Sequence, residues 1–194
     1  TSTFAPLFFR MTDTDRKIVA AQGYVELGLF DEARAELNSL PESFSRRSDV
    51  VEISVLCCMG ERRWEEALEQ ATLLCQISPK EPGGFIHAAY CMHEMGRTRE
   101  AVEVLIHGPP TLHGKAVYFY NLGCYHARLG NIKGAVEMLR QAFLKDETLR
   151  RDAKLLKLTE SHAAALAFAS YVPDARDFAA LVDPLAQEAG LTLP

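Results

Sequence analysis

Alanine recurs at intervals of 34 residues, at Ala33, Ala67, Ala101 and Ala135. This interval is the length of two helices joined by a turn, a unit that cannot bury its apolar side alone and must stack on its own copies. Apolar residues within the expected helices follow helical spacing, and no stretch alternates convincingly with the period of a strand. The repeat therefore predicts an all-α fold of stacked helix pairs.

Other positions follow the same register. A small or helix-ending residue stands five positions before each alanine, and an often bulky residue stands three before it. The first set is Gly28, Arg62, Gly96 and Gly130, and the second is Phe30, Trp64, Thr98 and Ile132. Glycine accepts the left-handed conformation that ends a helix. We therefore expect the first helix of each pair to end at the first set and the second helix to begin at the second.

Two repeats depart from this register. Arg62 stands where the other repeats have glycine, and the nearest glycine is Gly60, so we expect a shifted or lengthened turn there. We also expect Trp64, which follows this turn, to be largely buried. Residues 106–110 end in Gly-Pro-Pro, which cannot continue a helix. The second helix of that repeat should therefore be short, with a loop running to about Gly114.

The most regular repeat spans 116–149 and contains Phe119, Leu122, Gly123, Gly130, Ala135, Leu139 and Ala142. This pattern resembles the tetratricopeptide repeat, in which an aromatic residue precedes Leu-Gly, followed by alanine and a bulky residue four positions later. The resemblance covers 14–149 and implies a right-handed α-α superhelix of four repeats with C-terminal capping helices. As a whole, the chain is similar to small bacterial tetratricopeptide proteins without assigned function.

Three regions follow from this interpretation. Residues 1–13 are an N-terminal tail or a cloning remnant. The four repeats span 14–149, as windows 14–47, 48–81, 82–115 and 116–149. Residues 150–194 form a helical cap and tail, because a stacked array needs a terminal helix over its last apolar surface. The first such helix is expected at about 149–170, with Leu149, Ala153 and Leu156 on one face, and another at 174–190.

Composition narrows the function. The net charge of −5 and the isoelectric point near 5.7 argue against a general nucleic-acid surface. No apolar run approaches the length needed to span a bilayer. The 5 cysteines are odd in number and mostly lie on apolar helical positions, which is typical of reduced thiols in a cytoplasmic protein. We therefore expect a cytoplasmic protein that contacts neither nucleic acid nor membrane.

The tetratricopeptide resemblance implies that the first helices line a concave groove that binds a peptide of a partner protein. In this register, the inner wall consists of Gln22, Glu26, Glu52, Leu56, Ile86, Tyr90, His93, Glu94, Tyr120, Cys124 and Arg128. Tyr90 and Tyr120 offer apolar rings with a polar tip, which suits peptide recognition. The alternative interpretation is that some of these residues only pack.

Some tetratricopeptide proteins hold a C-terminal carboxylate with a clamp of Lys, Arg and Asn side chains. The corresponding positions here are Ile18, Gln22, Ile53, Gly83 and His87. None of them is Lys, Arg or Asn, so the resemblance does not extend to a charged carboxylate clamp.

No combination of residues indicates catalysis, and we expect neither an enzyme nor a cofactor. His87, Cys91 and His93 lie in one expected helix, with Cys124 and His126 in another, but their spacing matches no standard zinc pattern. A phosphate-binding loop and a second metalloprotease histidine are absent. We therefore predict a non-catalytic scaffold without a metal.

Two alternatives stay open. The apolar terminal segments could pack into the groove of the same chain or of a second copy, making the protein autoinhibited or self-assembling. Residues 81–96 are also similar to the third repeat of the tetratricopeptide chaperones of bacterial type III secretion, although this likeness covers one repeat only.

Overall fold

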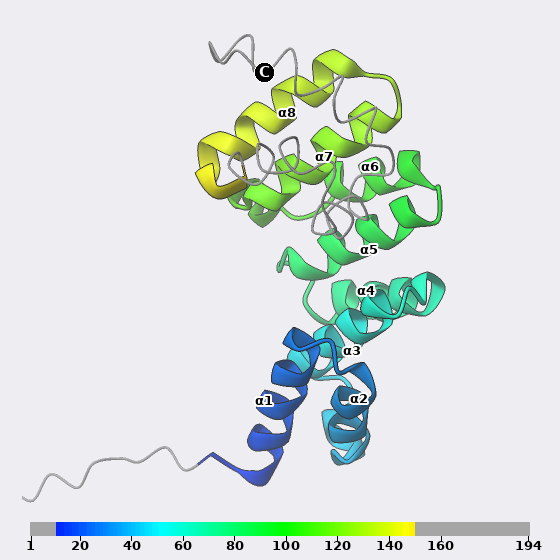
Figure 1. Ribbon diagram of the computed structural model, residues 1–194, viewed down its shortest axis with the longest axis vertical. Helices are drawn as coiled ribbons and strands as arrows, with labels where there is room; N and C mark the ends of the chain where they lie inside the picture. Colours follow the sequence, from blue (N-terminus) through cyan, green and yellow to red (C-terminus); the bar gives the residue numbers. More distant parts are fainter. Residues whose placement is uncertain (1–10, 150–194) are drawn as a thin grey trace, which may run out of the picture. The chain divides into compact units, whose positions relative to one another are not determined.

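The computed structural model describes residues 11–149, and every regular element in that range is a helix (Figure 1). The described helices belong to two compact units that divide between Ser78 and Pro79. The first unit holds α1 (Asp13–Glu26), α2 (Phe30–Asn38), η1 (Glu42–Phe44), α3 (Ser48–Gly60) and α4 (Trp64–Ile77). The second holds α5 (Gly83–Glu94), α6 (Thr98–Ile106), η2 (Pro110–Gly114), α7 (Ala116–Arg128) and α8 (Ile132–Lys145). The predicted all-α class is confirmed for this range, whereas the helices expected at 149–170 and 174–190 lie almost entirely outside it.

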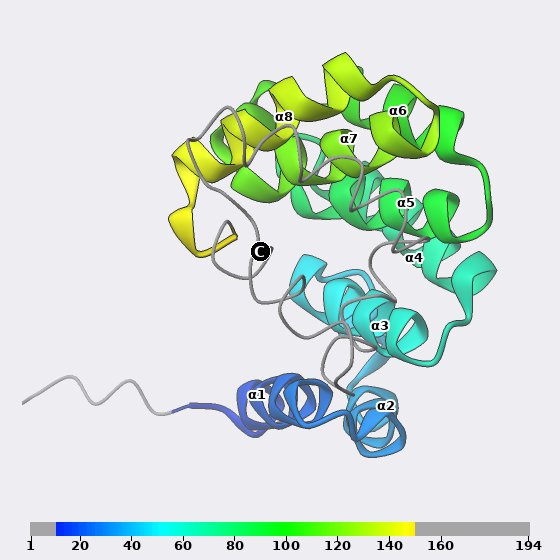
Figure 2. The ribbon, with the colours of Figure 1, turned by 45° about the horizontal axis from the view of Figure 1, so that its top comes forward.

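Consecutive helices pack as pairs within each unit. The most extensive contacts join α1 to α2 and α3 to α4 in the first unit, and α5 to α6 and α7 to α8 in the second. Figures 1 and 2 show the two members of these pairs side by side. Within each unit the second pair also rests on the first, because α3 contacts both α1 and α2, and α7 contacts both α5 and α6.

The four pairs repeat the same local geometry. Their second helices begin at Phe30, Trp64, Thr98 and Ile132, as the register predicts. Two residues earlier the backbone is left-handed, with φ of 73° at Gly28, 59° at Arg62, 78° at Gly96 and 78° at Gly130. The periodic alanines Ala33, Ala67, Ala101 and Ala135 are all 0% exposed. A methyl group at this position lets the paired helices approach closely.

The turn at Arg62 corrects one expectation. We predicted a shifted or lengthened turn, but the three residues between α3 and α4 match the three between the helices of the other pairs. Arg62 itself adopts the left-handed conformation. Gly60 does not take over the role of Arg62 in the turn. Gly60 is the last residue of α3, and a Cβ added there would lie 2.1 Å from Cζ of Phe30. Glycine at position 60 therefore makes room for the Phe30 ring.

The apolar cores lie between adjacent pairs. In the first unit, Val50, Ile53 and Cys57 of α3 cluster with Ile18 and Ala33 of the first pair, and Ala21 joins them. In the second unit, Tyr118, Leu122 and Tyr125 of α7 cluster with Ala89, Ala101 and Leu105. The first helix of each second pair thus inserts its apolar side against the pair before it.

Two smaller expectations are refined. The helix α6 ends at Ile106, as the Gly-Pro-Pro sequence predicts, but Pro110–Gly114 forms a short 3-10 helix rather than an irregular loop. Its Leu112 is 0% exposed and joins the core of the second unit, which explains why this segment is ordered into a turn. Trp64 is only partly buried.

Candidate functional site

The predicted inner-wall residues all lie on first helices of the pairs. In the first unit, Gln22 and Glu26 lie on α1, and Glu52 and Leu56 lie on α3. Gln22 donates a hydrogen bond from Nε2 to Oε1 of Glu26 at 3.3 Å. Glu26 and Glu52 are exposed, whereas Gln22 and Leu56 are partly buried. The exposed inner-wall residues of the first unit are therefore acidic.

The second unit carries the other seven residues, and their exposure divides them. Ile86, Tyr90, His93 and Glu94 lie on α5, and the remaining three lie on α7. Tyr90, His93 and Tyr120 are 9%, 5% and 7% exposed. This differs from the expectation that both tyrosine rings face a ligand. His93 packs on Tyr125 of α7, and Tyr120 clusters with Ala135, Leu139 and Ala142 of α8.

His93 lies against the core of the second unit. Its ring stacks on Tyr125 with the centroids 4.6 Å apart and the planes tilted by 33°. Its Nδ1 lies 3.0 Å from Oγ1 of Thr98, the first residue of α6. Burial first, and then the positive charge of Arg128, lower the pKa of His93 to about 4. The imidazole is therefore neutral at pH 7, which suits its buried position.

Tyr125 is a central residue of this cluster that the sequence interpretation did not select. It is 2% exposed, and burial raises the pKa of its hydroxyl, with Cys124, Tyr90 and Glu94 as further charge neighbours. The register carried a signal, because Cys57 and Cys91 occupy the equivalent positions and are also buried. A larger polar residue at a position that holds a thiol in the two preceding pairs could have identified Tyr125.

The cysteines form no disulfide, and burial raises the pKa of four of their thiols. All 5 cysteines are free. Burial raises the pKa of Cys124 to about 12, against an opposing hydrogen bond with Tyr120, and raises that of Cys57 to about 11. Such thiols are poor nucleophiles at neutral pH. Across residues 11–149, no group of three His, Cys, Asp or Glu side chains is arranged to hold a metal ion.

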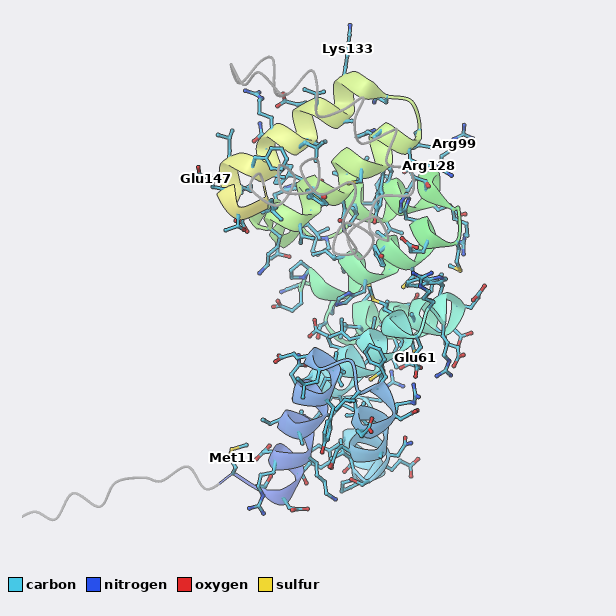
Figure 3. The ribbon with its side chains drawn as sticks, viewed as in Figure 1. Met11, Glu61, Arg99, Arg128, Lys133 and Glu147 are labelled. Atoms are coloured by element: carbon cyan, nitrogen blue, oxygen red, sulfur yellow. The ribbon has the colours of Figure 1, made fainter. Side chains whose placement is uncertain are left out.

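The first helices of the second unit both end in a charged residue. Glu94 ends α5 and is partly exposed, and Arg128 ends α7 and is exposed. Figure 3 shows Arg128 at the C-terminal end of α7, at the same end of this unit as Arg99. The two end residues carry opposite charges at equivalent positions of their pairs.

The sequence matches no protein-family model, and no curated protein is similar to it by sequence comparison. Among the described helices, none is long and apolar enough to cross a membrane.

Proposed function

We propose that this chain is a non-catalytic scaffold of the tetratricopeptide type, which binds a peptide segment of a partner protein along the first helices of its repeats. The proposal includes the stacking of the four pairs as a right-handed superhelix. It places the bound peptide on the set of first-helix residues from Gln22 to Arg128 named above.

One observation carries this proposal: three local features recur at intervals of 34 residues in all four pairs. They are a left-handed residue, a helix that begins two residues later, and a buried alanine three residues after that. A helix pair of this length, repeated in this way, is the unit of a stacked array, and such arrays bind partners on their extended surfaces.

The burial of Tyr90, His93 and Tyr120 narrows the surface that supports binding. The inner-wall residues that are exposed or partly exposed are mostly polar. They include three glutamates, Glu26, Glu52 and Glu94, and one arginine, Arg128. Complementary charges set the orientation and specificity of a bound segment more than its raw affinity. We therefore propose that the peptide carries charged residues of both signs.

Selection from a random peptide library on the immobilised full chain tests this function. Selected peptides are synthesised, and their dissociation constants are measured by fluorescence anisotropy. The variant Arg128→Glu should weaken binding by about fivefold or more, because it reverses a charge at the proposed surface. The matched control is Arg99→Glu, which changes another exposed arginine, on the second helix α6 of its pair, and should leave the affinity unchanged.

Failure to recover any peptide above background would contradict the binding function. Peptides that respond equally to both arginine variants would contradict its location on the first helices.

A further inference from the structure

The turn between α1 and α2 lies next to the turn between α3 and α4, at one edge of the first unit. Phe30, which begins α2, has its ring against the backbone of Gly60, which ends α3. Arg34 of α2 donates a hydrogen bond to Glu61, the first residue of the second turn. Figure 3 shows Glu61 at that end of α3. We give the name turn edge to the exposed residues of the two turns, which are residues 27–29, Arg62 and Arg63.

Arg62 holds a backbone conformation that an arginine side chain disfavours. Its φ of 59° is left-handed, and Gly28, Gly96 and Gly130 form the equivalent turns without the cost of a Cβ. The Arg62 side chain is exposed and makes no hydrogen bond, ion pair or ring contact with another residue of 11–149. No such contact of this side chain offsets the strain. Residues held in strained conformations cluster at functional sites, which directs attention to what Arg62 could bind.

The carboxylate next to Arg62 is already paired with other arginines. Glu61 accepts a hydrogen bond from Arg34 and another, at 3.2 Å, from Nη1 of Arg63. Glu65, three residues after Arg62, is exposed and does not pair with it. Arg34 and Arg63 thus neutralise Glu61, whereas the charge of Arg62 is left for a group from outside the described chain.

The neighbouring turn adds two exposed apolar side chains to this edge. Leu27 is 73% exposed, and Leu29, on the other side of Gly28, is 41% exposed. The equivalent positions of the second turn hold Glu61 and Arg63, which form the ion pair described above. A single exposed leucine is ordinary in proteins, but two within one turn, next to a charged turn, form an apolar patch with a polar rim. Patches of that kind mark interaction sites.

We propose that the turn edge is an interaction surface for a protein segment that presents a carboxylate next to apolar side chains. The carboxylate pairs with the guanidinium of Arg62, which can offer two parallel N–H donors to it. The apolar side chains cover Leu27 and Leu29 and remove them from water. Charge complementarity favours an acidic segment over a basic one, because Glu61 is already paired within the chain and Arg62 is not.

The turn edge is distinct from the inner wall. The inner-wall residues of the first unit lie on the helices α1 and α3, whereas Leu27, Leu29 and Arg62 lie between helices. The inference therefore goes beyond the proposed function and does not depend on it. It also gives a reason for an arginine at a position where glycine would suit the backbone better, because binding residues are often kept at a cost in stability.

Peptide selection on the immobilised full chain, with counter-selection against the variant Arg62→Gly, tests the proposal. The peptides that survive depend on Arg62, and they are sequenced and synthesised. Their dissociation constants are measured by fluorescence anisotropy. Arg62→Gly suits the left-handed turn, so a loss of binding would not come from a disturbed backbone. The matched control is Arg46→Gly, which removes another exposed arginine of the first unit.

We expect the surviving peptides to be enriched in Asp or Glu beside Leu, Ile or Phe, and to bind Arg62→Gly about tenfold more weakly than the wild type. Leu27→Ser should weaken binding by about threefold, and Arg46→Gly should leave it unchanged. The proposal would be overturned if no peptide survives, if the survivors lack acidic residues, or if both glycine variants bind equally.

The variant Arg128→Glu separates this surface from the inner wall. It should leave the affinity of these peptides unchanged, and a loss of affinity would place them on the inner wall, which overturns the turn edge but not the proposed function. If Arg62→Gly lowers the free energy of unfolding, Arg62→Asn decides by the same comparison with Arg46→Asn. Asparagine also tolerates the left-handed conformation and removes the charge.

Discussion

Arg62 is the one residue other than glycine with a positive φ among residues 11–149. The left-handed conformation crowds a Cβ against the following carbonyl, which costs an L-residue roughly 1–2 kcal/mol. The surrounding contacts must offset that cost, because the turn keeps the same length as the turns with glycine. Glu61 next to it accepts hydrogen bonds from Arg34 and from Arg63, and so holds the turn from both sides.

We predict that Arg62→Gly stabilises the protein by about 0.5–1 kcal/mol, since relief of the strained backbone exceeds the added entropy of the unfolded chain. The free energy of unfolding is measured by urea denaturation. The reverse change at an equivalent turn, Gly96→Arg, should destabilise by a similar amount. A lower stability of Arg62→Gly would show that the Arg62 side chain makes contacts worth more than the backbone strain.

The lowered pKa of His93 makes the free energy of unfolding depend on pH. Its pKa is lowered from 6.5 to about 4 in the folded chain, mainly by burial, while the unfolded chain keeps the ordinary value. Between these two values the unfolded chain binds a proton that the folded chain does not. Falling pH therefore favours unfolding, and the contribution of His93 is present above pH 6.5 and is lost as pH falls toward 4.

We predict that this residue accounts for about 3 kcal/mol of stability loss between pH 7 and pH 4, and that His93→Gln reduces the loss by most of that amount. Denaturation curves at several pH values measure it. Parallel pH profiles for wild type and His93→Gln would show that His93 takes up its proton without unfolding the unit.

At the scale of elements, the approach of α2 to α3 depends on one missing side chain. Gly60 ends α3 where the Phe30 ring, at the start of α2, leaves no room for a Cβ. In the sequence alone, Gly60 resembles a displaced helix terminator, because a glycine near a helix end usually has that role. The packing reason was not visible, since it depends on a ring from the preceding pair.

We predict that Gly60→Ala destabilises the protein by about 1–3 kcal/mol through overpacking. The control is Gly23→Ala in α1, where the added Cβ meets nothing within 4 Å. That change should stabilise by about 0.5–1 kcal/mol, because alanine loses less entropy than glycine in a helix. Thermal melts followed by circular dichroism compare the two variants. Similar melting temperatures would mean that Phe30 moves aside at little cost.

For the molecule as a whole, sequence reasoning was most successful where the cause is local. The left-handed turns, the starts of the second helices and the short α6 each follow from residues within a few positions of one another. The exposure of the candidate site residues could not be predicted in this way. Equivalent positions on first helices hold the partly buried Gln22 and Leu56 but the buried Tyr90. Exposure at these positions depends on what the neighbouring helices cover, so register alone could not determine it.

The amino-acid sequence by itself determined that this chain forms helix pairs at intervals of 34 residues, because each turn and each alanine contact involves residues close in the chain. Only the tertiary structure decided which side chains of those pairs are exposed and which are buried. In the tertiary structure His93 and Tyr125 are buried in contact with each other, and Tyr90 and Tyr120 are buried as well. Leu149 packs on the last helix pair. These outcomes required contacts between helices that are distant in sequence, and periodicity does not report such contacts.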